Sequence, residues 1–478
     1  MRVKVFNLDN DTCRSTDIDN AIVRGKLCTY LKKTLIIVIK IIKLIEKRMY
    51  RMILQRSDLK DLFLRILRFS PYAFISCFIS AFCACLVMWA VYSLPIDKIR
   101  NNTQDSIVSL LQSPKAIEYT FTGKKLDVFT DSIMLGIASI NIPENSFLAS
   151  IENRRPYFGL HPYYNLIFSL KSKNYLSADR SRVDGRFWNG YLALIKPLLV
   201  FLNLGQIRII NYVCQIILLL TALFFIAKKI NFLYSIAFFI VILFINPISA
   251  GWCLEYSIAY YIMLLAVIYL LLNNKTDEMR VFLFTGIALA FFDFLVSPLI
   301  TLGIPLVVLI CLRQNMFKTA DVISCCAAWF MGYAGMWFSR WVFITIFTPI
   351  NAVQECFQHL WYRLFGDGSA EIGKNIDFSP MVSLSSNLMQ FPIKVFFVVM
   401  LLYVICCYVV KKINKYPSIT INTASILSVA LLPFLWYIVV VNHSIIHSWI
   451  TYRNLSVTIF ALSVYIIKLI GNNKQKVS

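Results

Sequence analysis

The sequence predicts an all-α, polytopic membrane protein with about ten transmembrane helices. Of its 478 residues, 58% are hydrophobic and only 15% are charged, whereas an average soluble domain is about 45–50% apolar and about 25% charged. Apolar runs of about 17 or more residues also recur along the chain. These observations exclude an ordinary soluble enzyme, and we expect the net charge of +22 to face a membrane surface and not a nucleic acid.

The apolar runs set the predicted positions of the spans. Nine of them lie at 71–93, 207–227, 231–249, 255–272, 281–298, 319–346, 391–410, 422–441 and 454–470. A tenth, shorter run at 299–312 follows Pro298, which we expect to separate two adjoining helices. No apolar segment with a cleavage site begins the chain, so we interpret the first span as a signal anchor.

Positive charge in the short loops predicts the orientation. These charges all fall on one side of the predicted spans: Lys228, Lys229, Lys275, Arg280, Arg313, Lys318, Lys411, Lys412, Lys415, Lys474 and Lys476. Because Lys and Arg favour the cytoplasmic side, both termini and the tail 471–478 should be cytoplasmic. The connections 94–206, 250–254, 347–390 and 442–453 are then extracytoplasmic, and the first of them is large.

The cytoplasmic region 1–70 is basic and carries two predicted interfacial helices. The segment 34–45 is too short to cross a bilayer, and Lys40 and Lys43 lie on its basic face. A second amphipathic helix has Ser57 as its N-cap and an apolar side that includes Leu59. We expect both helices to bind the anionic lipids of the inner leaflet.

The large first outer loop offers a pair of carboxylates. Asp127 and Asp131 are four residues apart, so a helix would place them on one face. Two carboxylates there could deprotonate a hydroxyl group or hold a divalent cation. The alternative is a solvated surface pair without chemistry. Later in this loop, Asp184 and Arg186 precede Trp188 in a segment whose guanidinium groups and aromatic faces suit phosphate and sugar contacts.

The short outer loop 442–453 is rich in polar and aromatic residues. His443 and His447 have the spacing of helical metal ligands, but the Glu of the metalloprotease motif is absent. Interfacial anchoring explains the aromatic residues of the loop, but it does not explain two histidines and Arg453. We therefore predict that the loop forms a polar wall of an active site, with metal binding as the alternative.

Two charged residues fall inside predicted spans. Asp293 and Arg340 both lie toward the outer ends of their helices, and a charge inside a membrane is costly enough to suggest a function. One interpretation is a structural ion pair between the two helices. The other is that Arg340 binds a lipid phosphate at the outer leaflet.

Other familiar motifs carry no function here. The patterns Asp9-Asn10-Asp11 and Asp17-Ile18-Asp19 match the short acidic motif of soluble glycosyltransferases, but they lie in a polar tail without an α/β domain. No phosphate-binding loop, dinucleotide fingerprint or serine elbow occurs. The 13 cysteines lie mostly in apolar runs without zinc-ligand spacing, which indicates packing residues.

The layout resembles the GT-C class of membrane glycosyltransferases, including bacterial serotype-converting glucosyltransferases. The resemblance covers nearly the whole chain and consists of about ten spans, a large first outer loop with an early acidic residue, and a late outer loop. It implies an enzyme of the bacterial cytoplasmic membrane that modifies surface polysaccharide. The implied donor is a polyprenyl-phosphate-linked sugar, and the implied acceptor is a surface glycan or a lipid-linked oligosaccharide.

The resemblance also implies roles for individual residues. Asp131 or Asp127 matches the expected base, Arg340 or Arg453 would neutralise the departing phosphate, and His443 and His447 would bind sugar hydroxyls. A flippase or other transporter is an alternative that would use Asp293 and Arg340, but no internal repeat supports it. A polymerase of lipid-linked O-antigen is a further alternative, because it shares this topology and carrier.

Overall fold

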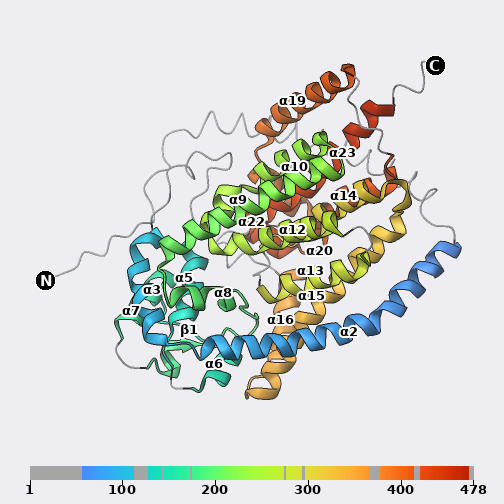
Figure 1. Cartoon of the computed structure of the whole chain (residues 1–478). Coiled ribbons are helices and arrows are strands. Elements are labelled where there is room, and N and C mark those ends of the chain that lie inside the picture. The colour runs from blue at the N-terminus through green and yellow to red at the C-terminus, as the bar shows by residue number, and fades with distance from the viewer. Residues whose placement is uncertain are drawn as a thin grey trace. The chain divides into compact units, whose positions relative to one another are not determined.

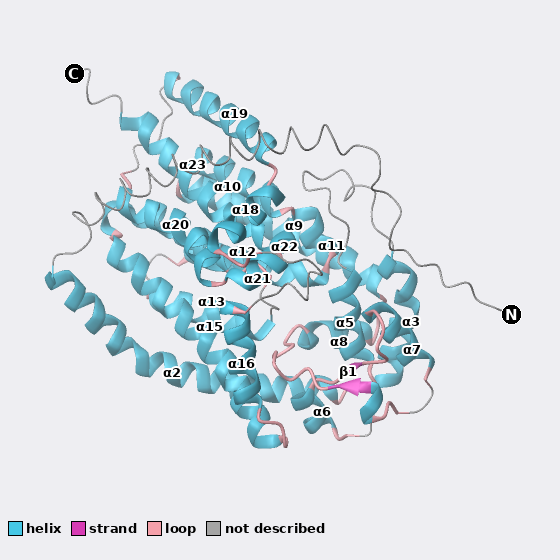
Figure 2. Ribbon diagram, turned by 180° about the vertical axis from the view of Figure 1, so that it is seen from behind, coloured by secondary structure: helices cyan, strands magenta, loops and turns pink. Residues whose placement is uncertain are grey.

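The computed structural model describes residues 56–111, 128–142, 144–172, 175–273, 276–292, 296–366, 377–413 and 420–472 (Figure 1). The chain divides into two units, Met1–Ser57 and Asp58–Ser478, and the second contains all the features discussed below. Its described part is almost entirely α-helical, with one two-stranded antiparallel ladder (Figure 2). The predicted interfacial helix at 34–45 lies outside the described residues.

A long first helix leads into a compact set of short elements, which we call the outer domain. The first helix is α2 (Arg56–Tyr92). The outer domain consists of α3 (Ile96–Leu111), α5 (Val128–Ser139), α6 (Ser146–Glu152), β1 (Arg155–Pro156), α7 (Pro162–Lys171), β2 (Ser181–Arg182) and α8 (Leu192–Leu199).

Longer helices follow the outer domain. They are α9 (Leu204–Lys229), α10 (Phe232–Ile245), α11 (Pro247–Trp252), α12 (Leu254–Leu272), α13 (Glu278–Phe292), α14 (Leu299–Arg313) and α15 (Thr319–Phe347). The last third of the chain forms α16 (Ala352–Phe365), α18 (Pro380–Gln390), α19 (Ile393–Lys412), α20 (Thr423–Val439), α21 (Val441–Ile446), α22 (Ser448–Thr451) and α23 (Leu455–Asn472).

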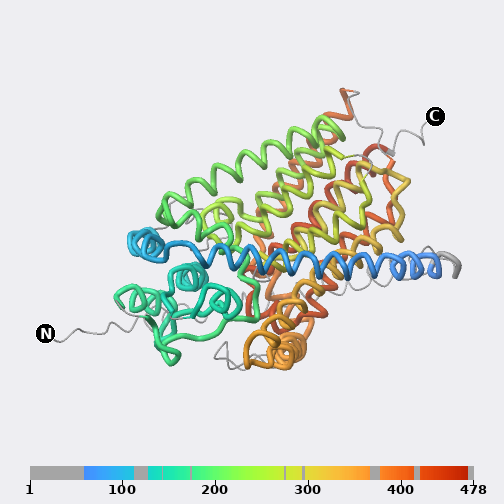
Figure 3. The backbone as a smooth tube through the Cα atoms, turned by 60° about the horizontal axis from the view of Figure 1, so that its bottom comes forward, coloured from blue at the N-terminus to red at the C-terminus, as the bar shows by residue number. Residues whose placement is uncertain are grey.

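The predicted all-α membrane fold is confirmed at this level. Among the described residues, seven helices are long and apolar enough to cross a membrane, and three apolar helices at 128–139, 232–245 and 423–439 are shorter. Each predicted span overlaps a helix, but the count of ten stays a prediction. One boundary was wrong: the amphipathic segment after Ser57 is not a separate helix, because α2 continues through Pro71 to Tyr92 (Figure 3).

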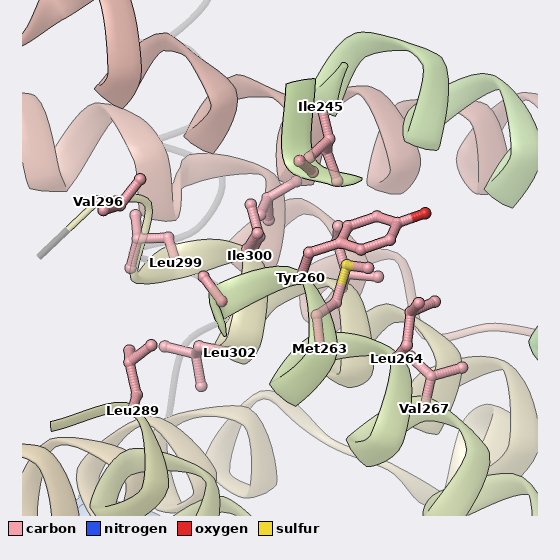
Figure 4. Close-up of a cluster of buried hydrophobic side chains, with 14 of the residues drawn as sticks. Ile245, Tyr260, Met263, Leu264, Val267, Leu289, Val296, Leu299, Ile300 and Leu302 are labelled. Carbon is pink, nitrogen blue, oxygen red and sulfur yellow. The ribbon is translucent and has the colours of Figure 1, made fainter. Parts of the chain in front are cut away.

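The core lies between helices that are hydrophobic on nearly every side. α14 is buried along almost its whole length, and residues of α10, α12 and α13 pack around it. Figure 4 shows this cluster, in which the buried side chains of Tyr260, Met263 and Ile300 lie close together. A helix that is apolar all round must be surrounded by protein or lipid, so this cluster fixes the helices on which the outer domain rests.

α13 and α15 cross at two glycines. A Cβ atom on Gly286 would lie 2.2 Å from the carbonyl oxygen of Trp329, and one on Gly332 would lie 2.2 Å from that of Leu283. Small residues let the backbones of two membrane helices approach closely. Each glycine therefore allows the other helix to approach, and this crossing holds α15, which carries Arg340, against the core.

Replacing Gly332 with Ala should destabilise the protein, because the added methyl group meets a backbone carbonyl that cannot rotate away. Overpacking of this kind costs about 1–3 kcal/mol. Gly335→Ala in the same helix is the matched control, since its methyl group meets only the Cys77 side chain. Unfolding of both variants in detergent measures the difference, and equal stabilities would contradict this account of the crossing.

The two ends of the helical bundle agree with the predicted sidedness of the loops. Residues expected on the cytoplasmic side form ion pairs there, Arg65 with Asp321 at 2.6 Å and Arg313 with Glu278 at 2.8 Å. Loops expected outside contact one another, as when Arg363 donates to the Asn442 side chain at 3.3 Å. The sidedness of the loops, the membrane and the side on which the termini lie stay predictions.

Candidate functional site

The outer domain is held together by short helices and the β1–β2 ladder. α5 packs between α3 and α7, and the ladder pairs Arg155 with Arg182. Residues opposite each other in a ladder project on the same face. The chain therefore brings two arginines from segments 27 positions apart to one face of the domain. Figure 2 shows β1 beside α6 and α7.

Asp131 is completely buried, and both of its carboxylate oxygens have partners. Oδ2 accepts a hydrogen bond from Nη2 of Arg208 at 3.0 Å, within an ion pair whose two side chains are at most 1% exposed. Oδ1 accepts from the backbone N–H groups of Leu254 and Glu255 at 3.1 and 3.4 Å. Asp131 therefore caps the N-terminus of α12, whose own N-cap residue makes no side-chain cap.

These contacts are those of a structural group. A carboxylate that is saturated by an arginine and two amides has no free oxygen with which to accept a proton from a substrate. The role of base predicted for Asp131 thus finds no support in its contacts. Asp127, its predicted partner, lies outside the described residues. No cluster of three His, Cys, Asp or Glu residues in the described ranges could hold a metal ion.

Arg340 fastens the outer domain to α15. Its Nε donates to the carbonyl oxygens of Gly185 and Phe187, both at 3.1 Å, and Nη2 donates to that of Ile151 at 2.5 Å. The side chain is 1% exposed, and its guanidinium lies 5.2 Å from the centre of the Trp188 ring. Phosphate binding is not evident in these contacts. The proposed pairing with Asp293 concerns a residue outside the described ranges.

Trp188 and Arg186 belong to the same attachment. The Trp188 ring is 1% exposed, and its Nε1 donates to the carbonyl of Met336 at 2.7 Å. Trp341 donates in turn to the carbonyl of Arg186 at 3.3 Å. The segment 183–191 is therefore bound to α15 through side chains from both sides. The aromatic residue that was predicted to contact sugar serves in this arrangement as a buried packing group.

The loop 442–453 is helical and lies at the start of α12. Arg453 donates through Nε to the last carbonyl of α10 at 3.0 Å, and its guanidinium lies 4.3 Å from the centre of the Tyr256 ring. The rings of His443 and His447 are 4.7 Å apart. Tyr256 directly follows Leu254 and Glu255, whose N–H groups donate to Asp131. Asp131 and Arg453 therefore both contact the first turn of α12. Arg340 has a separate set of contacts in the outer domain.

Asp184 is the carboxylate with the most unusual surroundings. It is 5% exposed, and its side chain makes no hydrogen bond or ion pair with any described residue. Only its backbone is fixed, by an N–H donated to the carbonyl of Glu152 at 3.2 Å. Burial raises its pKa, whereas the positive charges of Arg155, Arg186 and Arg340 act to lower it.

This arrangement can perform acid–base chemistry. A carboxylate with a raised pKa is a stronger base than an ordinary carboxylate. Perturbed groups of this kind concentrate at functional sites. Tyr191 lies close enough for the charge of Asp184 to raise its pKa, although burial is the larger cause. The surroundings of Asp184 therefore combine a proton acceptor, cations and an aromatic ring.

The sequence indicated part of this site. The alternation of charge in the segment 180–186 places Asp184 among arginines, and we expected sugar and phosphate contacts there. Arg155 and Arg208 were missed, because neither lies in a recognised motif. The adjacent arginines at 154 and 155 were a usable signal for the first.

No family model, curated protein or solved structure matches this chain. Its function must therefore be argued from the fold and from the site.

Proposed function

We propose that the protein is a membrane glycosyltransferase that moves a sugar from a polyprenyl-phosphate donor to a surface glycan or lipid-linked acceptor on the outer face of the bacterial cytoplasmic membrane. The observation that carries this proposal is the buried carboxylate of Asp184, which makes no hydrogen bond or ion pair with a described residue and is subject to the positive charges of Arg155, Arg186 and Arg340. The domain adjoins helices that are long and apolar enough to cross a membrane, where a lipid-bound donor would lie.

The proposed reaction needs one proton acceptor and a cationic environment. The Asp184 carboxylate takes the proton of an acceptor hydroxyl group as that oxygen bonds to the anomeric carbon of the donor sugar. The bond between the anomeric carbon and the phosphate oxygen breaks, and polyprenyl phosphate leaves with the electron pair. Arg186 stabilises the negative charge on the departing phosphate. No divalent cation is required for this sequence of steps.

Asp131 has a supporting role in the proposal. It holds the start of α12 against the outer domain through the ion pair with Arg208. Arg453 contacts the same helix start through the Tyr256 ring, and the proposal gives His443, His447 and Arg453 no step in the reaction. The contacts of Arg340 do not support a transporter that uses this residue at the membrane midplane, because Arg340 donates its hydrogen bonds to carbonyl groups of the outer domain.

Transfer by the purified full-length protein tests the proposal. Proteoliposomes are supplied with polyprenyl phosphate that carries labelled glucose, galactose or mannose, together with envelope glycan as acceptor. We expect label in the glycan and release of an equal amount of polyprenyl phosphate. Movement of intact donor between leaflets without transfer would instead indicate a flippase. Absence of transfer from every donor would contradict the proposal.

The pH dependence of transfer should reveal the raised pKa of Asp184. The base works only when ionised, and its pKa lies above the usual value of about 3.9 for Asp. Transfer should therefore decline as the pH falls through that raised value, well before an ordinary carboxylate would be protonated. Initial rates measured across the acid range check this. A rate that stays constant down to about pH 4 would contradict the role of Asp184.

A further inference from the structure

A small pocket opens between α5, β1 and α7 in the outer domain. Its volume is about 220 Å³, and its lining includes Phe129, Arg155, Tyr157, His161 and Asn165. This is below the range of roughly 300–1,000 Å³ for pockets that hold drug-sized ligands. The space suits one small ring and not an extended chain.

The polar groups free to meet a ligand in this pocket are donors. Nε of Arg155 is buried without a hydrogen-bond partner. His161 accepts a hydrogen bond at Nδ1 from the N–H of Tyr163 at 3.3 Å, so its proton is on Nε2, which has no partner among the described residues. The Asn165 side chain binds the backbone at 158–160, where Oδ1 accepts two hydrogen bonds and Nδ2 donates one.

The charge and the aromatic rings of the pocket also favour an anionic ligand. Among the described residues, no acidic side chain lines the pocket. The guanidinium of Arg182 lies 3.4 Å from the centre of the Tyr157 ring, and the Phe129 ring meets His161 edge-on with centroids 5.3 Å apart. The ligand therefore meets two donors, the positive charge of Arg155 and aromatic rings. An anionic group that only accepts hydrogen bonds complements such a set, and Arg binds carboxylates particularly well.

We propose that this pocket binds a single sugar residue that carries a carboxylate, such as a uronic acid unit of the acceptor glycan. Arg155 and His161 donate to the carboxylate, and the ring lies against Tyr157. This inference rests on the proposed glycosyltransferase function for the identity of the glycan as acceptor.

Direct binding tests the pocket without any need for transfer. The full-length protein in lipid nanodiscs is titrated with glucuronate and with glucose, and saturation-transfer NMR measures the bound fraction. We expect glucuronate to bind at least about tenfold more tightly than glucose, because a charge-assisted pair forms only with the carboxylate. Similar binding of the two sugars, or binding of neither, would overturn the proposal whether or not the protein transfers sugar.

Two variants and a matched control locate the binding. Arg155→Gln should weaken glucuronate binding at least about tenfold. His161→Asn should also weaken it, while Asn can still cap α7 and keep the domain folded. Arg180→Gln changes an exposed arginine of the same domain that does not line the pocket, and it should bind as the wild type does. Unchanged binding in both folded pocket variants would overturn the assignment.

Discussion

Asp184→Asn should reduce sugar transfer at least about 100-fold while the protein still accumulates in the membrane. An amide cannot accept the proton of the acceptor hydroxyl, and the loss of general base catalysis costs typically 10²–10⁴-fold in rate. The carboxylate makes no hydrogen bond or ion pair within the described structure, so Asn breaks no contact and keeps the volume. Initial rates at matched amounts of folded protein, measured with the labelled donor, give the effect.

Asp179→Asn is the matched control for this experiment. It removes a carboxylate five positions away, in the same domain, whose side chain is 74% exposed and paired with Arg180 at 3.6 Å. We expect this variant to transfer sugar at the wild-type rate. If Asp184→Asn were as active as Asp179→Asn, Asp184 would not be the base. Loss of folded protein in Asp184→Asn alone would mark it as a structural residue.

Breaking the buried ion pair of Asp131 should have the largest effect on stability. Removal of one partner leaves an uncompensated charge in the interior, which costs about 3–5 kcal/mol. Arg208→Met should therefore lower the free energy of unfolding by about this amount, because Asp131 is 0% exposed and loses the positive charge that balances it. Combining Asp131→Leu with Arg208→Met should recover much of the loss. Unfolding in detergent–denaturant mixtures measures both.

An exposed pair supplies the comparison. Asp277 and Arg280 are 45% and 58% exposed, so Asp277→Asn should cost less than about 1 kcal/mol. Similar small losses in Arg208→Met would contradict the structural role of the buried pair. Asp131→Asn also separates the two interpretations of Asp131. Destabilisation supports the cap and ion pair, whereas a fully stable but inactive variant would restore Asp131 as the candidate base.

The sequence predicted the fold more fully than it predicted the site. Spans could be located because a helix inside a bilayer needs about 20 apolar residues, and this requirement leaves a strong signal in composition. The limits of a helix need not coincide with those of the membrane. The apolar side that begins at Leu59 suggested a separate interfacial helix, whereas α2 continues through Pro71, as membrane helices can.

The partners of individual charges were harder to predict. Arg340 was singled out correctly as a costly charge, but its partners are carbonyl groups in the segments 151 and 185–187. The direction in which a backbone carbonyl points in a distant loop cannot be predicted from the residue types. Arg208 was overlooked because an arginine at the outer start of a span resembles an interfacial residue. Its pairing with Asp131 depends on how α5 packs near α9 and α12.

A structure of the full-length protein with a polyprenyl phosphonate analogue of the donor tests the central claim most directly, because it places the reacting carbon. We expect the anomeric carbon to lie within a few ångströms of the Asp184 carboxylate, with the phosphonate facing Arg186. A donor bound at the start of α12, beside Asp131 and Arg453 and away from Asp184, would contradict it.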